Sequence, residues 1–129
     1  MVYAEFLAKV RVRGEYPGQK EAEHVSRTVL ALLGTQLDQD QVRHVAHSVP
    51  EQVAETLRAS SINGHQVGTD AFLATVADKR RSKTLESARW DVSTVLSTLA
   101  ESLATDELHQ MLTALSPGFA SLFGHPELH

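Results

Sequence analysis

The chain has 129 residues, of which 42% are hydrophobic and 5% aromatic, and its formal net charge is −4 with neutral histidines. This length is enough for one compact domain with a core of Leu, Val and Ala, and the acidic balance gives no general attraction to nucleic acid. The absence of cysteine excludes disulfides and thiolate chemistry and fits a reducing compartment. There is no apolar run of the roughly 18 residues that a membrane span needs, and the first residues do not resemble a signal peptide, so we expect a cytoplasmic protein that does not enter the membrane.

The first predicted helix lies near the N-terminus. Tyr3, Phe6 and Val10 recur at three- and four-residue steps, which is the spacing of one face of a helix. Phe72 and Val76 repeat Phe6 and Val10 after 66 residues. The chain therefore contains two copies of a short helix with an apolar face.

A basic connector follows each short helix. The first contains glycine and proline, which mark a turn, and the second has four cations in the five positions from Lys79 to Lys83. Such a run binds a phosphate or an acidic partner in some proteins, and more often it is a solvated loop. The anion-binding candidates are Arg11, Arg13, Lys79, Arg80, Arg81 and Lys83.

Two longer patterns, over residues 21–37 and 85–103, each predict a long helix with one apolar stripe. The stripe of the second helix begins at Leu85, and its opposite face carries Trp90 and several hydroxyl residues. The same 66-residue offset relates the two helices. The matching positions are Ala22 and Ala88, Thr28 and Thr94, Val29 and Val95, Leu30 and Leu96, Leu33 and Leu99, and Leu37 and Leu103.

The two long helices also differ. Val25 and Leu32 add a second apolar line to the first helix, where the second helix has Asp91 and Thr98, so we expect the first helix to be buried on more sides. Trp90 either fills a gap between the two units or anchors a partner or a second copy of the chain. Trp90, Val25 and Leu32 are therefore the candidates for an interaction.

Caps and prolines delimit the shorter helices. Asp38 has the form of an N-cap with Gln41 three residues on, and we expect Thr105 to cap the corresponding helix of the second copy. Pro50 and Pro117 close these third helices and can open a fourth.

The pattern as a whole predicts an all-α fold. It contains two repeated units of about four helices each, packed into one bundle-like domain. We place the first unit at residues 1–58, a linker at 59–68, the second unit at 69–124 and a tail at 125–129.

Three groups of residues also carry a family resemblance that extends from Tyr3 to Phe123. They are the helix starts Phe6-Leu7 and Phe72-Leu73, the long-helix openings Glu21-Ala22-Glu23 and Glu86-Ser87-Ala88-Arg89, and the short-helix ends Val49-Pro50 and Leu115-Ser116-Pro117. In these packing motifs the chain resembles the bacterial family called domain of unknown function 2267. The resemblance implies a small all-α bacterial protein, often with a duplicated unit, and it supplies no catalytic residues.

One set of residues has the spacing of a metal site. Asp40, His44 and His47 would lie on one face of the third helix, where they offer two or three ligands to zinc or a similar ion. Polar residues on a solvated helix face are the commoner origin of such a set, and the second unit has no matching histidines. We expect no cofactor.

No enzyme motif occurs, so we expect a protein without catalytic activity. The first hypothesis is a helical interaction or structural module in the bacterial cytoplasm, with a protein partner or a second copy of itself as in a homodimer. An alternative is the binding of an anion or nucleic acid through the basic connectors, although the net charge disfavours nucleic acid. A second alternative is a surface metal site at Asp40, His44 and His47.

Overall fold

A computed structural model describes residues 1–61, 66–82 and 84–124, and these form α-helices and no strand. The all-α prediction is therefore confirmed. The helices are α1 (Tyr3–Gly14), α2 (Gln19–Gly34), α3 (Gln39–Ala46), α4 (Glu51–Ser60), α5 (Thr69–Arg80), α6 (Leu85–Ser102), α7 (Thr105–Ala114) and α8 (Phe119–Phe123).

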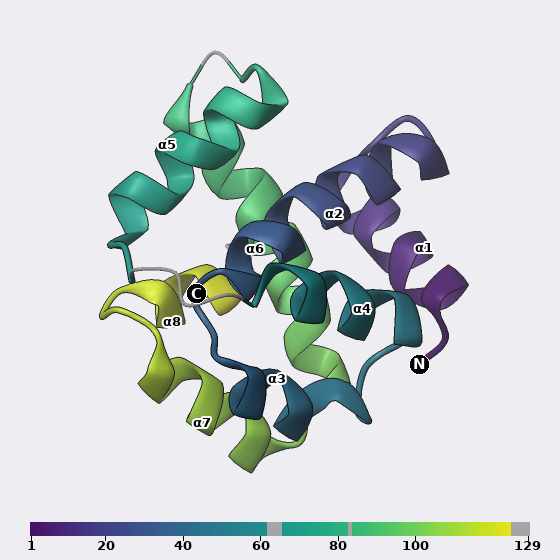
Figure 1. The fold of residues 1–129 in the computed structure, drawn as a ribbon. Coiled ribbons are helices and arrows are strands. Elements are labelled where there is room, and N and C mark those ends of the chain that lie inside the picture. Colours follow the sequence, from purple (N-terminus) through teal and green to yellow (C-terminus); the bar gives the residue numbers. More distant parts are fainter. Residues whose placement is uncertain (62–65, 83, 125–129) are drawn as a thin grey trace.

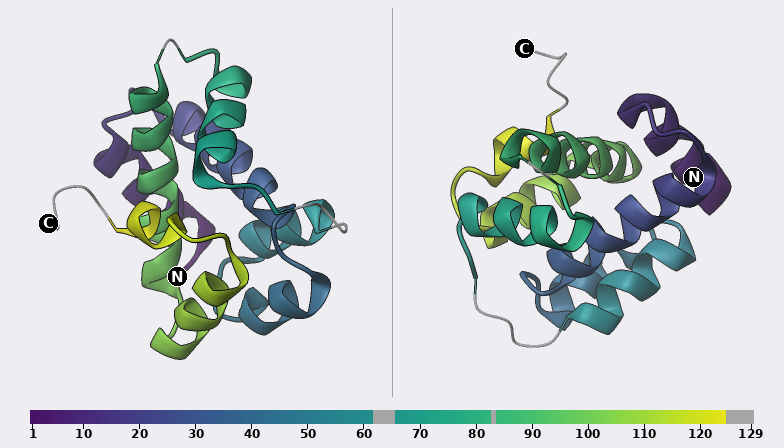
Figure 2. Two further views of the ribbon diagram at one scale, coloured as in Figure 1. Left: turned by 90° about the vertical axis from the view of Figure 1, so that its left-hand side faces the viewer. Right: turned by 90° about the horizontal axis from the view of Figure 1, so that it is seen from above.

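Four helices form the centre of the molecule. α1 packs against α2 and α6, α5 packs against α6 and α2, and α2 and α6 contact each other. α4 covers α2, and α8 covers α6. The α1–α2 and α5–α6 connectors lie at one end of the molecule, and α3 and α7 lie side by side at the other (Figures 1 and 2).

The helix boundaries follow the sequence offset. α1 begins at Tyr3 and α5 begins 66 positions later at Thr69. Both end at a non-glycine residue in the left-handed conformation, Glu15 with φ 57° and Arg81 with φ 56°. The division into two units with the boundaries given above stays a prediction.

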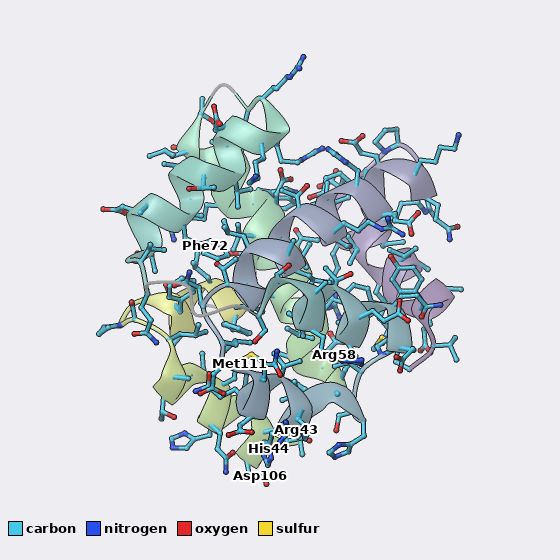
Figure 3. All side chains as sticks on the ribbon, viewed as in Figure 1. Arg43, His44, Arg58, Phe72, Asp106 and Met111 are labelled. Atoms are coloured by element: carbon cyan, nitrogen blue, oxygen red, sulfur yellow. The ribbon has the colours of Figure 1, made fainter. Side chains whose placement is uncertain are left out.

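One continuous core joins the helices. Leu30, Leu33, Leu96 and Leu99 are each at most 2% exposed, as the long-helix stripes predict. The rings of Phe72 and Phe119 meet edge to face with their centroids 5.1 Å apart, which ties α5 to the start of α8 (Phe72 is labelled in Figure 3).

The relative burial of the two long helices differs from the sequence prediction. All residues from Asp91 to Leu99 are buried, including the hydroxyl residues of the polar face, so the expectation that the first long helix is buried on more sides is wrong. The reason is that α1 covers the polar face of α6, whereas part of α2 stays open. Leu85, predicted in the buried stripe, is 53% exposed because it is the first residue of α6.

The caps are partly as predicted. The backbone N–H of Gln41 donates to Oδ1 of Asp38 at 2.8 Å, and the backbone N–H of Asp38 donates to Oε1 of Gln41 at 2.8 Å, which confirms this cap. α7 is capped differently: its N-cap is Ala104 rather than Thr105, and the backbone N–H of Ala104 donates to Oε1 of Glu107 at 2.8 Å. α4 continues to Ser60, two residues into the stretch predicted as linker.

Candidate functional site

A partly buried polar network lies where the α1–α2 connector meets α5 and α6. Tyr16 donates its hydroxyl to Oδ1 of Asp91 at 2.6 Å, and Nε of Arg80 donates to Oδ2 of the same carboxylate at 3.2 Å. Nη2 of Arg80 also lies 2.6 Å from Oε2 of Glu21. The side chains of Arg80 and Asp91 are only 13% and 8% exposed. The network therefore links the α1–α2 connector, α2, α5 and α6 through two carboxylates, one guanidinium and the Tyr16 hydroxyl.

The ionisation of this network favours a neutral tyrosine and a charged arginine. Burial, together with the hydrogen bond to Asp91 and the charge of that carboxylate, raises the pKa of the Tyr16 phenol above its ordinary value. Burial opposes the charge of Arg80, but the bonds to Glu21 and Asp91 outweigh it, and the pKa of the guanidinium is raised. A tyrosine held neutral in this way is a poor general base.

Of the three interaction candidates, one is buried in the core and a second is partly buried. Val25 is fully buried, so it packs in the core and cannot meet a partner in the folded protein. Trp90 is partly buried, and its Nε1 donates to the carbonyl of Gly14 at 3.1 Å, so the indole ties α6 to the end of α1. A Cβ atom on Gly14 would lie 2.1 Å from the Tyr16 ring, so the absence of a side chain there makes room for Tyr16.

A second set of ion pairs closes the junction between α1 and α6. Nζ of Lys9 lies 3.2 Å from Oε1 of Glu101, and Nη2 of Arg13 pairs with Oε2 of the same carboxylate. Nη1 of Arg13 also donates to the Thr98 hydroxyl at 3.1 Å. Glu101 thus holds two cations of α1 against α6.

The six anion-binding candidates differ in whether a carboxylate of the chain already binds them. Arg13 and Arg80 are neutralised by the carboxylates described above. Arg11, Lys79 and Arg81 are exposed. The last candidate, Lys83, lies outside the described residues. The basic connectors therefore present fewer available cations than the sequence suggested.

Leu32, the third interaction candidate, lies in an open groove of about 470 Å³ between α2 and α5. Its volume falls in the range of sites that hold small ligands or side chains. The groove is lined by Arg27, Thr28, Ala31, Leu32 and Thr35 of α2, Ser60 of α4 and Lys79 of α5. Leu32 and Lys79, which the sequence assigned to two separate hypotheses, here share one surface.

The other lining residues were missed by the sequence reasoning. For Thr35 the sequence holds one signal. At the 66-residue offset Thr35 corresponds to Glu101, so the carboxylate that closes the α1–α6 junction has no counterpart on α2.

The metal candidates do not converge. Asp40 pairs instead with Arg43, Oδ1 to Nη1, at 2.8 Å, and Nε2 of His47 lies 3.7 Å from Oε2 of Glu107. Among the described residues no group of three His, Cys, Asp or Glu side chains could hold a metal ion. Figure 3 shows His44 and Arg43 at the solvated end where α3 meets α7.

The junction of α3 and α7 has only a small cavity, of about 20 Å³, which is room for one water molecule. It is lined by Leu37, Gln41, His44, Val45, Glu107, Gln110 and Met111. The backbone N–H of Ala104 and the hydroxyl of Ser48 lower the pKa of Glu107, against the opposing effect of burial. Glu107 thus acts as a charged helix cap that also reaches α3.

The groove is lined by hydroxyl, apolar and cationic side chains. The hydroxyls of Thr28 and Thr35 donate to carbonyls of their own helix, at 2.9 Å and 2.6 Å. None of the described residues that line the groove is a histidine or a carboxylate. What the groove supplies is shape, an apolar contact and positive charge.

Fold and groove together define an all-α helical module with an open groove on one face. The chain belongs to the family described as "Uncharacterized conserved protein (DUF2267)", whose model matches residues 3–122 and thus nearly the whole chain. This confirms the resemblance seen in the sequence. No curated protein matches the chain. In the described part of the chain, no helix has the length and apolar character needed to cross a membrane.

Proposed function

We propose that the protein is a non-catalytic helical interaction module that binds a segment of another protein, or of a second copy of itself, in the groove between α2 and α5. The observation that carries this proposal is the groove, where the half-buried side chain of Leu32 lies beside Lys79 between two helices of the central group. We also propose that the module works in the bacterial cytoplasm. A chain without cysteine suits that reducing compartment.

The alternatives have less support. Binding of an anion or nucleic acid by the connectors would need several free cations, and two of the five described candidates, Arg13 and Arg80, are held by carboxylates. A metal site on α3 would need Asp40, which is exposed and paired with Arg43. Neither alternative draws together several candidate residues as the groove does.

The proposal is tested by nuclear magnetic resonance on ¹⁵N-labelled protein. The protein is titrated with short peptides that share a central leucine and differ in charge, and its own concentration is varied separately. We expect the amide signals of residues 27–35 and 79 to shift with at least one peptide or with concentration. Leu32→Asp should weaken this binding about tenfold or more, because it replaces the apolar contact with a charge.

Leu85→Asp is the matched control, because Leu85 is an exposed leucine at the start of α6 that does not line the groove. It should leave binding unchanged, and circular dichroism should show both variants to be as helical as the wild type. Binding that is equally strong in Leu32→Asp, or groove signals that no peptide and no concentration shifts, would refute the interaction module.

A further inference from the structure

We propose that the partner segment in the α2–α5 groove is acidic, with a carboxylate against Lys79 and a neighbouring apolar side chain against Leu32. This inference rests on the proposed function and specifies the chemistry of the partner. It follows from a comparison of two junctions within the molecule.

At the first junction, α1 packs on α6, and the chain supplies its own carboxylate. Glu101 of α6 forms ion pairs with Arg13 and Lys9 of α1, and Arg13 also donates to the Thr98 hydroxyl at 3.1 Å. The polar face of α6 is closed by these contacts. This junction shows what a cation at the end of the short helix binds when a carboxylate is within reach.

At the second junction, α5 packs on α2. Lys79 stands 66 positions after Arg13, so a cation is kept at the end of the short helix. Thr35 stands 66 positions before Glu101, and Leu32 stands where the other helix has a threonine. The α2–α5 junction therefore keeps a cation, Lys79, at the position of Arg13. It has Thr35 in place of the Glu101 carboxylate and the apolar Leu32 in place of Thr98.

Lys79 is available to a partner. Its side chain is exposed, and it pairs with no carboxylate of the described residues. Thr35 cannot replace the missing acid, because its hydroxyl donates to the carbonyl of Leu32 at 2.6 Å. Arg27, which also lines the groove, is exposed; it pairs with Glu23 at 3.4 Å and interacts with the Tyr3 hydroxyl. Among the described residues, the groove lining thus has two cations and no acid.

The dimensions fit a short peptide segment. From Arg27 to Thr35 the open face of α2 runs about 12 Å at 1.5 Å per residue, which matches two turns of a helix or three to four extended residues. Thr28 and Ala31 are short, so they allow a backbone to approach α2 closely. An exposed ion pair contributes little affinity, so the carboxylate sets the preference for the segment while the apolar contact provides most of the binding.

The experiment compares three eight-residue peptides that differ only in the residue before a central leucine, which is Glu, Gln or Lys. Binding to ¹⁵N-labelled wild type is followed at residues 27–35 and 79, at low and at high salt. We expect the Glu peptide to bind about three- to fivefold more tightly than the Gln peptide at low salt, with the Lys peptide weakest, and the preference should shrink at high salt.

Variants of Lys79 assign the preference to the groove. Lys79→Ala should make the Glu and Gln peptides bind equally, and Lys79→Glu should reverse the preference in favour of the Lys peptide. Arg81→Ala is the matched control: it removes an exposed cation two positions away that does not line the groove, so it should keep the full preference for Glu.

The outcomes separate the two proposals. If the peptides bind through Leu32 but do so equally well, or if Arg81→Ala removes the preference as fully as Lys79→Ala, the acidic partner is refuted and the interaction module stands. If the unliganded protein shifts the same signals with its own concentration and this competes with the peptides, the groove belongs to a second copy and the acidic partner is again refuted. If nothing shifts the groove signals, both proposals fail.

Discussion

The Tyr16 hydroxyl reaches from the α1–α2 connector to the Asp91 carboxylate, which is 2.6 Å away and also bound by Arg80. A hydrogen bond to a charged acceptor stabilises a fold by roughly 1.5–3 kcal/mol, because an unpaired buried carboxylate is costly. Tyr16 is the donor, so it can make this bond only while its phenol is protonated. Ionisation of the phenol would place two negative charges together in a partly buried site.

Tyr16→Phe should lower the free energy of unfolding by about 1–3 kcal/mol at neutral pH, because it leaves one lone pair of Asp91 without its donor. The folded state raises the pKa of Tyr16 above its ordinary value of 10.0, so this stabilisation is complete below pH 10 and is lost as the pH rises beyond it. Urea denaturation from neutral to alkaline pH should therefore show wild type and variant converging above about pH 10.

The control for this prediction is Tyr3→Phe. Tyr3 donates to Glu23 at 3.0 Å from a more exposed position, and burial also raises the pKa of its phenol. Tyr3→Phe should lower the free energy of unfolding by less than Tyr16→Phe does, and this difference from wild type should depend less on pH. A difference between wild type and Tyr16→Phe that stays constant or grows in alkali would contradict the role assigned to the buried hydrogen bond.

At the scale of the helices, the close approach of α2 and α4 depends on one glycine. A Cβ atom on Gly34 would lie 2.7 Å from the carbonyl oxygen of Leu57 and 2.8 Å from Cβ of Ser60. The first of these is a backbone atom, which cannot move aside without shifting α4. Gly34 therefore sets the spacing between the two helices.

Gly34→Ala should destabilise the protein by about 1–3 kcal/mol through this overpacking, although alanine is the better helix former by about 1 kcal/mol. Gly18→Ala is the matched control, since nothing lies within 4 Å of its added Cβ, and it should cost about 0.5–1 kcal/mol, because glycine is preferred to alanine at the N-cap of α2. Thermal unfolding of the two variants measures the contrast. Equal stability of Gly34→Ala and wild type would show that α4 can shift at little cost.

At the scale of the molecule, one core joins residues from the beginning and the end of the chain. Phe6 of α1 and Phe119 of α8 are both fully buried in the cluster that also contains Leu99. Helices distant in sequence therefore depend on the same packing, and unfolding should be cooperative.

Leu99→Ala should lower the free energy of unfolding by about 2–5 kcal/mol, through lost transfer energy and the cavity left behind. Unfolding should remain a single transition in both circular dichroism and Trp90 fluorescence. Leu85→Ala is the control, because Leu85 is 53% exposed, and it should cost about 0.5 kcal/mol or less. Two separate transitions would mean that the halves of the chain fold on independent cores.

Much of the fold could be predicted from the sequence because helical periodicity is a local signal. The spacing of Leu30, Leu33, Leu96 and Leu99 identifies the buried stripes of α2 and α6, and Asp38 with Gln41 marks the start of α3. The 66-residue offset, read from paired residues, recurs in the starts of α1 and α5. Leu32 and Lys79 were also identified as candidates for binding, though not as parts of one surface.

Only the tertiary structure decided which polar faces are covered. Periodicity shows that one face of α6 carries hydroxyls, but Thr98 is buried because α1 lies over it, and its hydroxyl donates to the carbonyl of Thr94 at 2.8 Å within the same helix. The pairs of Tyr16 with Asp91 and of Arg13 with Glu101 join positions 75 and 88 residues apart. Such pairs depend on how the helices cross. For the same reason, only the packing of α5 on α2 shows that Lys79 lies beside Leu32 in a groove whose described lining residues include no carboxylate.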